Sequence, residues 1–233
     1  MGTLRRGVKV LASRILPDSE KLRYLAYLPK LEAWRRLRAA SVPEFGDRLA
    51  LYDHVHSTVL GGGPLTYLEF GVYRGDSIRY WSQLDRHPSS RFVGFDTFTG
   101  LPDDWRGFTG GQSKGTFDVG GRAPDVLDSR VSFVTDLFQD TLAGFLAGHA
   151  LQPPLVVHVD CDLYSSALYL LARCDDALVP GSLVLFDEFS SILDEFRSLE
   201  DYCSAFQRSY EVVGVVPRGP EFSYYQQIAI RMT

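Results

Sequence analysis

Short apolar runs rich in β-branched residues alternate with longer segments of helical periodicity from residue 65 to the end of the chain. The apolar runs predict strands at 65–70, 91–95, 131–134, 155–160, 183–187, 210–216 and 225–232. The intervening periodic segments predict helices at 75–86, 139–148, 165–178 and 193–208. Apolar strands separated by helices are typical of a mostly parallel sheet covered on both faces. The pattern therefore predicts an α/β domain, whose last strand pairs antiparallel at or near a sheet edge.

The first 60 residues follow a different pattern. Residues 3–40 predict two helices separated at Pro17, and residues 44–60 predict a third that ends at a glycine run. We therefore expect residues 1–60 to form a helical extension, used as a lid or in oligomerisation, and residues 61–233 to form the α/β domain. Residues 100–128 are rich in glycine and show no periodicity. A loop of this length predicts a lid or binding loop, or a disordered segment.

Charge is unevenly distributed along the chain, whose formal net charge is −5. Residues 1–40 hold ten Lys and Arg against three acidic residues, so the remainder is strongly acidic. The acidic part lacks basic clusters interleaved with aromatic residues, which disfavours nucleic acid as a partner. Packing of the basic segment against the acidic body or a partner subunit is the simpler expectation, and it favours a homo-oligomer such as a dimer.

The cysteines and the apolar stretches indicate in which cellular compartment the protein is expected. The 3 cysteines form no Cys-x-x-Cys pair, which argues against a disulfide framework and a zinc site and favours a reducing compartment. Basic residues interrupt the apolar residues near the start, so no signal peptide or membrane span is predicted. We expect a cytoplasmic protein with no membrane partner.

The segment from Glu69 to Ser77 places an acidic residue and two glycines where an apolar strand turns into a helix. Gly71 and Gly75 let the backbone bend and approach a ligand, and the helix that follows points unpaired N–H groups at a carboxylate. Glu69 is able to accept a hydrogen bond from an ammonium group. The turn therefore suits the amino-acid end of a ligand, although a plain strand-to-helix turn has the same residues.

Carboxylates stand at or just beyond the ends of five predicted strands, where ligands bind in open parallel sheets. Asp96 lies about 20 residues beyond the glycine turn, a position from which a carboxylate accepts from ribose hydroxyls. Asp136 is a candidate acceptor for an adenine amino group, and Phe98 or Phe138 a candidate apolar face for the base. Together these positions predict a pocket for an adenosine joined to an amino acid.

Asp160 and the pair Asp187-Glu188 follow two strands that are separated by one helix, so their ends are expected to be neighbours. Converging carboxylates are costly unless a cation neutralises them, and oxygen ligands favour Mg²⁺, Mn²⁺ or Ca²⁺. These residues are therefore a candidate metal site. The alternative is that one carboxylate faces a helix terminus and another is solvated.

The chain resembles class I S-adenosylmethionine-dependent methyltransferases, and within them the macrocin O-methyltransferase family of sugar O-methyltransferases. The resemblance covers residues 65–232 and rests on five motifs, which are 69–75, 94–102, 138–142, 160–166 and 187–189. It implies a Rossmann-like sheet of seven strands. It also implies a divalent cation, Mg²⁺ or Mn²⁺, held by Asp160, Asp187 and Glu188, where relatives often have a second Asp in place of Glu188. The donor contacts that it implies are Glu69, Gly71, Tyr73, Gly75, Ser77, Asp96, Thr97, Phe98, Asp136 and Asp160.

Methyl transfer to oxygen requires that a hydroxyl be oriented and deprotonated. Asp162 is the candidate base, because it lies one pleat beyond Asp160 and so on the same face of an extended segment. His158 shares that parity and is a second catalytic candidate, although a lone histidine on a strand is more often a core residue. The acceptor implied by the resemblance is a sugar or another small-molecule or oligosaccharide hydroxyl.

Two other functions remain open from the residues. Asp160-Cys161-Asp162 also matches the Asp-x-Asp of metal-dependent glycosyltransferases, a reading that leaves the glycine turn unexplained. A methyltransferase fold without activity, serving as an assembly partner through its basic helices, is the third possibility.

Overall fold

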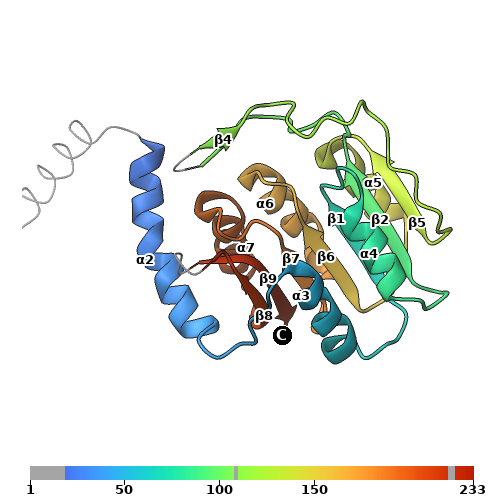
Figure 1. Cartoon of the computed structure of the whole chain (residues 1–233), viewed down its shortest axis with the longest axis horizontal. Helices are drawn as coiled ribbons and strands as arrows, with labels where there is room; N and C mark the ends of the chain where they lie inside the picture. The colour runs from blue at the N-terminus through green and yellow to red at the C-terminus, as the bar shows by residue number, and fades with distance from the viewer. Residues whose placement is uncertain (1–18, 108–109, 220–223) are drawn as a thin grey trace, which may run out of the picture.

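The computed structural model of the chain describes residues 19–107, 110–219 and 224–233. Its centre is a seven-stranded sheet with the strand order β5-β2-β1-β6-β7-β9-β8 (Figure 1). The strands are β1 Thr66–Phe70, β2 Arg91–Asp96, β5 Val131–Thr135, β6 Leu155–Val159, β7 Leu183–Phe186, β8 Tyr210–Pro217 and β9 Tyr225–Met232.

The first five strands in this order pair in parallel, whereas β9 is antiparallel to both of its neighbours, β7 and β8. The predicted strands and the predicted antiparallel end of the sheet are thus confirmed. The last strand of the chain lies one position inside the sheet, and β8 forms the edge. This is a Rossmann-like α/β fold, as predicted.

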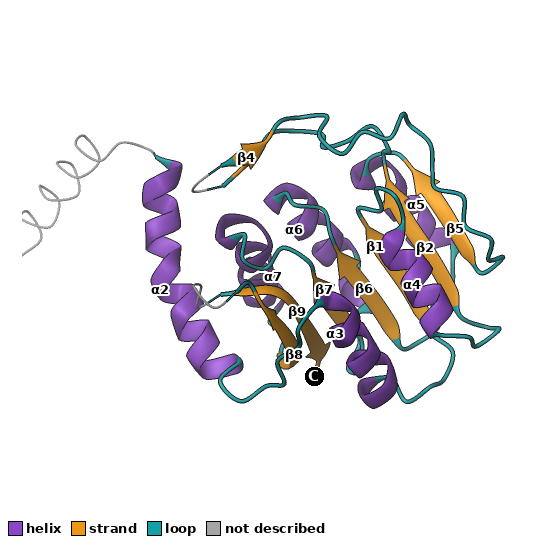
Figure 2. Ribbon diagram, viewed as in Figure 1, coloured by secondary structure: helices purple, strands orange, loops and turns teal. Residues whose placement is uncertain are grey.

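Helices cover both faces of the sheet, as the ribbon in Figure 2 shows. One apolar core packs residues of α3 and α4 against the sheet, and the other core holds residues of α2, α5, α6 and α7. The helices and helical turns are α2 Glu20–Arg38, α3 Arg48–His54, η1 Val55–Val59, α4 Asp76–Leu84, α5 Phe138–Gly148, α6 Tyr164–Arg173, η2 Asp175–Ala177, η3 Ile192–Phe196 and α7 Arg197–Phe206. The turns η1 and η3 are π-helical, and η2 is a 3₁₀ turn.

The helix α2 is docked on the domain by a buried tryptophan. The ring of Trp34 packs 4.8 Å from the ring of Phe189, and its Nε1 donates a 2.7 Å hydrogen bond to the hydroxyl of Tyr210. The side chain of Ser19 caps the start of α2 by accepting from the backbone N–H of Leu22. The second predicted N-terminal helix is therefore confirmed, and the first lies outside the described residues.

The helix α3 begins at Arg48, later than the predicted start at 44, because the residues before it pair with the sheet edge. Phe45 N–H donates to the Val215 carbonyl at 2.9 Å, and Val215 N–H donates to the Pro43 carbonyl at 3.0 Å. Asp47 then caps the helix by accepting from Ala50 N–H. This segment, predicted as part of a separate extension, is thus hydrogen-bonded to β8.

The loop predicted at 100–128 contains one short hairpin, formed by β3 Trp105–Arg106 and β4 Gly111–Gln112. Figure 1 shows the hairpin reaching from the sheet toward α2. The indole Nε1 of Trp105 donates to Oδ2 of Asp194 at 3.1 Å, which fastens the hairpin to η3. The loop is therefore held across the domain by a side-chain contact that its own sequence does not indicate.

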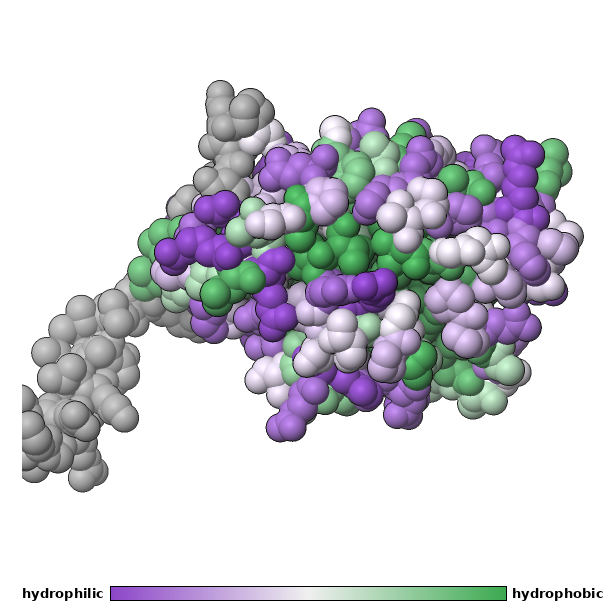
Figure 3. All heavy atoms as spheres, turned by 90° about the horizontal axis from the view of Figure 1, so that it is seen from below, coloured by the Kyte–Doolittle hydropathy of each residue, from purple (hydrophilic) through white to green (hydrophobic). Residues whose placement is uncertain are grey.

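Hydrophilic residues cover much of the face in Figure 3, with hydrophobic residues exposed between them near its middle. None of the helices within the described residues is long and apolar enough to span a membrane. All three cysteines, Cys161, Cys174 and Cys203, are unpaired in the structure.

Candidate functional site

A cavity of about 280 Å³ opens at the carboxyl ends of the central strands. Residues that follow β1, β2, β6 and β7 line it, in the position expected for a ligand site in an open parallel sheet. Eight of the predicted site residues contribute to its wall, namely Gly71, Tyr73, Asp96, Thr97, Asp160, Asp162, Asp187 and Glu188. The cavity thus joins the predicted donor residues to the predicted metal residues.

The glycine turn after β1 is shaped by its neighbours on both sides. Gly71 has a φ of +92°, and a Cβ atom built on it would lie 1.7 Å from the carbonyl oxygen of Asp160. Its N–H donates to the Phe95 carbonyl at 2.9 Å. Only glycine meets both requirements, a left-handed backbone and contact with the end of β6. The turn therefore packs between the ends of β2 and β6.

The carboxylate of Asp96 organises the same turn. Oδ2 accepts from the N–H groups of Val72 at 2.7 Å and Tyr73 at 2.8 Å, and Oδ1 accepts from Phe98 N–H at 2.7 Å. A carboxylate offers about four lone-pair sites, so these three bonds leave acceptor capacity toward the cavity. Asp96 is thus held in a fixed orientation in which it remains able to accept from a ligand hydroxyl.

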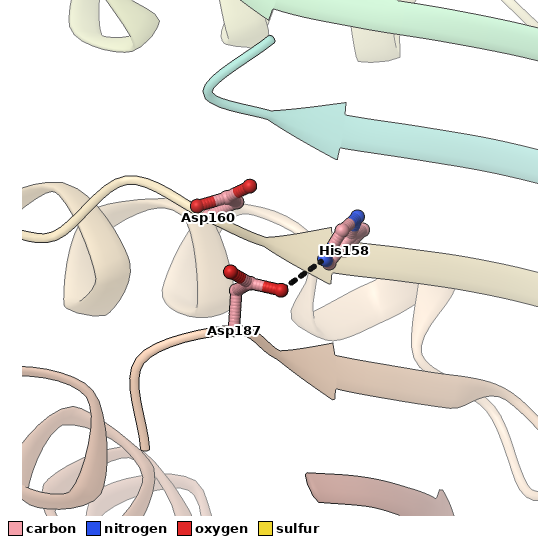
Figure 4. Close-up of side chains that lie close together, drawn as sticks. All are labelled: His158, Asp160 and Asp187. Atoms are coloured by element: carbon pink, nitrogen blue, oxygen red, sulfur yellow. Dashed lines mark ion pairs between the residues drawn. The ribbon is translucent and has the colours of Figure 1, made fainter. Parts of the chain in front are cut away.

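The acidic half of the cavity is centred on the adjacent strands β6 and β7. His158, Asp160 and Asp187 each place a potential ligand atom within 4.8 Å of the others (Figure 4). Burial, followed by the negative charge of Asp187, raises the pKa of Asp160 well above its usual value. Although burial favours the neutral form of Asp187 too, the nearby His158 and Arg48 lower the pKa of that carboxyl. Two adjacent carboxyls, buried Asp187 and partly buried Asp160, thus compete for one negative charge.

The oxygen atoms of this pair suit a hard divalent cation. Among the described residues, no group donates a hydrogen bond to the carboxylate of Asp160. A carboxyl that is partly withdrawn from water and has no donor partner is costly as an anion unless positive charge lies beside it. The residues present therefore fit Mg²⁺ or Mn²⁺ by donor type and by electrostatics.

Glu188, the third predicted metal ligand, lines the cavity but points its carboxylate elsewhere. Its Oε2 accepts from Nε2 of Gln226 at 2.6 Å, and its N–H donates to Oε2 of Glu195 at 2.9 Å. Within the described residues, the metal-like group contains His158 rather than Glu188. A part for Glu188 in metal binding stays a prediction that requires its side chain to leave Gln226.

Asp162 reaches the cavity by a route that differs from the predicted one. The strand β6 ends at Val159, and Asp162 has a left-handed φ of 61° within a tight turn closed by the bond from Leu163 N–H to the Cys161 carbonyl. The expectation of an extended segment with two residues on one pleat is therefore wrong. The carboxyl still faces the cavity, and burial followed by the charge of Glu188 raises its pKa to about 7.

His158 is the centre of a buried polar network. Its Nδ1 lies 2.7 Å from the hydroxyl of Tyr67 and its Nε2 lies 3.3 Å from the hydroxyl of Tyr52. Although burial opposes protonation, Asp187 and Glu69 raise its pKa to about 10. His158 does not line the cavity. Its contacts are with other buried side chains, so a catalytic role for His158 stays a prediction.

Five of the ten predicted donor residues also do not line the cavity, namely Glu69, Gly75, Ser77, Phe98 and Asp136. Glu69 is buried and accepts a 2.6 Å hydrogen bond from the Tyr67 hydroxyl. Gly75 forms the left-handed N-cap of α4. Phe98 is fully buried with its ring edge-on to Phe133, so its side chain belongs to the core.

The region predicted to face adenine is only partly as expected. Asp136 is exposed, and its Oδ1 accepts from the N–H of Leu137, the next residue. Leu137, Phe138 and Gln139, at the start of α5, line the cavity instead. Phe138, the other aromatic residue suggested for this role, therefore lies at the cavity wall. The contact of Asp136 with the donor stays a prediction.

The structure adds cavity residues that the sequence does not single out. Trp105 and Phe117 come from the long loop, and the ring of Phe117 lies edge-on, 5.6 Å from that of Tyr73. Arg48, from the start of α3, places Nη1 3.7 Å from Oδ2 of Asp187. No local motif marks Arg48, because its contact joins segments that are far apart in the chain.

Comparison with known proteins agrees with this geometry. The family model of a methyltransferase domain matches residues 68–189, more than half of the chain. No curated protein matches.

Three solved structures share the fold. The O-methyltransferase NovP has 21% identity, with 80% of this chain and 79% of that chain covered and a TM-score of 0.59. The TDP-rhamnose 3′-O-methyltransferase CalS11 of calicheamicin biosynthesis has 20% identity, coverage of 99% and 93%, and a TM-score of 0.54. A CmcI structure described as holding Mg and SAM has 14% identity, coverage of 80% and 72%, and a TM-score of 0.52.

The methyltransferase model spans the strands from β1 to β7, and with them the glycine turn, Asp96 and the neighbouring acids Asp160 and Asp187. The chain therefore belongs to the methyltransferase-domain family.

Proposed function

We propose that the protein transfers a methyl group from S-adenosylmethionine to a hydroxyl of a sugar or glycoside, assisted by a divalent cation. The observation that carries this proposal is the single cavity lined by Gly71 and Asp96 on one side and by Asp160, Asp162 and Asp187 on the other. A methyl donor and a chelated hydroxyl would meet within it.

The donor would lie along the glycine turn. The remaining acceptor capacity of Asp96 suits ribose hydroxyls, and Leu137 with Phe138 offers an apolar wall to the base. When bound, the donor supplies a methyl group on a sulfonium sulfur, and the carbon–sulfur bond breaks as the hydroxyl oxygen bonds to that carbon. The acidic lining of the cavity favours the positive charge of such a donor.

Asp160 and Asp187 would hold the cation, with Glu188 as a further ligand if it leaves Gln226. When bound, a divalent cation lowers the pKa of a coordinated hydroxyl and fixes its position. Asp162 lines the cavity beside this pair and would take the proton that the hydroxyl loses. The chain thus supplies orientation, charge balance and a proton acceptor.

The acceptor class is supported by two observations. Trp105 and Phe117 give the cavity aromatic surface beside carboxylates, a combination that suits a ring bearing hydroxyl groups. In addition, CalS11, which shares the fold, is described as a methyltransferase of TDP-rhamnose. A sugar hydroxyl is the acceptor that fits both.

We also propose that residues 61–233 form the catalytic domain, that the preceding helical segment contributes to the site, and that the protein is a homodimer. Arg48 contacts Asp187 and Tyr52 contacts His158, and both come from α3. These contacts support a contribution of the helical segment to the site. Light scattering of the full chain tests the third, since a monomeric mass would refute it.

The function is tested by calorimetric titration with S-adenosylhomocysteine, followed by a screen of sugar and glycoside acceptors with labelled donor, with and without Mg²⁺. We expect one donor site per chain and metal-stimulated label transfer to a hydroxyl compound. Nucleoside diphosphates are the comparison ligands. Binding of these with Mg²⁺, without binding of S-adenosylhomocysteine, would favour the glycosyltransferase reading and refute the proposal.

A further inference from the structure

Arg48 is a basic residue in the otherwise acidic wall of the cavity. The described residues that line it include five carboxylates, which are Asp96, Asp160, Asp162, Asp187 and Glu188, and Arg48 is the one Lys or Arg among them. Its guanidinium is paired with the carboxylate at the centre of the acidic half, with Nη1 3.7 Å from Oδ2 of Asp187. The guanidinium of Arg48 thus occupies, on the cavity side of Asp187, the region where a divalent cation is expected.

The backbone of Arg48 is fixed, whereas its side chain has room to move. Residues 43–45 are hydrogen-bonded to Val215 of β8, and the cap of Asp47 on Ala50 N–H sets the start of the helix. One turn further along α3, the Tyr52 hydroxyl lies against His158. The side chain of Arg48 nevertheless keeps 36% of its surface exposed. The guanidinium can therefore turn within the cavity without a shift of the helix.

The ion pair of Arg48 competes with a metal for the same oxygen atoms. Oδ1 of Asp187 already faces Nε2 of His158 at 3.8 Å, so Oδ2 is the oxygen left for a further positive group. A guanidinium and a divalent cation repel each other at this range, and Coulomb energies at a partly buried site are substantial. Both cannot hold Oδ2 of Asp187 together at close range.

We propose that Arg48 is the built-in counter-ion of the acidic pair, and that a divalent cation displaces its guanidinium from Asp187, so that Arg48 sets the metal affinity of the site. This inference rests on the proposed function, since it takes Asp160 and Asp187 as the metal ligands. The counter-ion stabilises the buried acids before the metal arrives and makes metal binding weaker and reversible. By thermodynamic linkage, the Arg48–Asp187 pair weakens metal binding by the same factor by which bound metal weakens the pair.

The test is a titration of the full-length protein with Mn²⁺, followed by calorimetry or by the loss of the free-ion spin-resonance signal. Arg48→Gln removes the charge, and Arg48→Lys keeps it. We expect Arg48→Gln to bind Mn²⁺ on the order of tenfold more tightly than the wild type, and Arg48→Lys to remain within a few fold of it. Arg36→Gln is the matched control, because Arg36 forms a comparable 3.6 Å pair with Glu32 on α2, and we expect it to have no effect.

An affinity for Mn²⁺ that is unchanged or weaker in folded Arg48→Gln would overturn the proposal. The thermal midpoint and circular dichroism of each variant establish that it is folded. If Arg48→Gln does not fold, Arg48→Lys decides the question. Binding of Mn²⁺ by Arg48→Lys that is much tighter than in the wild type would then refute a role for the charge of Arg48. Absence of Mn²⁺ binding in every variant would also refute it. Titration of the same samples with S-adenosylhomocysteine in the absence of metal separately reports whether the donor half of the proposed function holds.

Discussion

Gly71 and Asp160 are in backbone contact, so that a Cβ atom on Gly71 would lie 1.7 Å from the carbonyl oxygen of Asp160. The two residues belong to different halves of the cavity, Gly71 to the glycine turn and Asp160 to the acidic half. Under the proposed function, this contact would set the distance between the methyl donor and the chelated hydroxyl. In-line transfer depends on such positioning, since small displacements of reacting groups cost large factors in rate.

Replacement of Gly71 by alanine should therefore damage both stability and donor binding. The φ of +92° is strained for alanine, and the new methyl group must push the end of β6 away. We expect a loss of about 2–4 kcal/mol in the free energy of unfolding and much weaker binding of S-adenosylhomocysteine. Gly144→Ala, within α5, is the control because its Cβ would meet no atom within 4 Å. Equal stability of the two variants in chemical denaturation would contradict the account.

Asp96→Ala should weaken donor binding. The substitution removes an acceptor for ribose and releases the N–H groups of Val72, Tyr73 and Phe98 that hold the turn. Loss of a ligand contact of this kind costs about 1–3 kcal/mol, so the dissociation constant of S-adenosylhomocysteine should rise by roughly 5- to 150-fold. Calorimetry measures it directly. An unchanged dissociation constant would show that Asp96 does not contact the donor.

Asp162→Asn should reduce turnover and leave donor binding intact. Asparagine keeps the size of the side chain but cannot take a proton, and loss of a general base lowers kcat by about 10²- to 10⁴-fold. Asp160→Ala should abolish the stimulation of turnover by metal, with donor affinity within a few fold of wild type. Single-turnover transfer of labelled methyl gives the rate for each variant. Wild-type turnover by Asp162→Asn would exclude this residue as the base.

The pair of Asp175 and Arg208 should make stability depend on acid pH. The bond from Arg208, with help from Tyr202, lowers the pKa of Asp175 in the folded state. A lowered folded pKa contributes stability above the unfolded pKa of about 3.9, and this contribution is lost as pH falls through the folded pKa.

We therefore expect Asp175→Asn to melt about 2–4 °C below the wild type at pH 7. The difference should shrink as the pH falls from about 4 through the folded pKa, because the unfolded chain binds a proton at Asp175 first and the folded protein does so only at lower pH. Differential scanning calorimetry over this pH range measures both values. A difference that stays constant down to acid pH would mean that the charge of Asp175 is not what stabilises the fold.

The sequence was sufficient for those features that depend on local pattern and topology. Alternating apolar runs predicted the seven strands, and the carboxylates at strand ends predicted the edge of the sheet that carries the cavity. Asp160 and Asp187 could be placed side by side because one crossover connection separates their strands. These predictions needed no knowledge of individual side-chain contacts.

Other features depend on contacts that have no local signature. Arg48 meets Asp187 across 139 positions of sequence, and the carboxylate of Glu188 is drawn away by Gln226, which lies on β9. Asp162 reaches the cavity from a left-handed turn, a conformation that could not be predicted from the presence of an aspartate. The orientation of these side chains is set by tertiary packing, so periodicity and motif spacing could not have specified it.

Calorimetric titration of the purified protein with S-adenosylhomocysteine, repeated with Asp96→Ala and Asp162→Asn, tests the central claim most directly. The account predicts one site per chain, an affinity that falls in Asp96→Ala, and an affinity that is unchanged in Asp162→Asn. Absence of binding by the folded wild-type protein, with or without Mg²⁺, would contradict it.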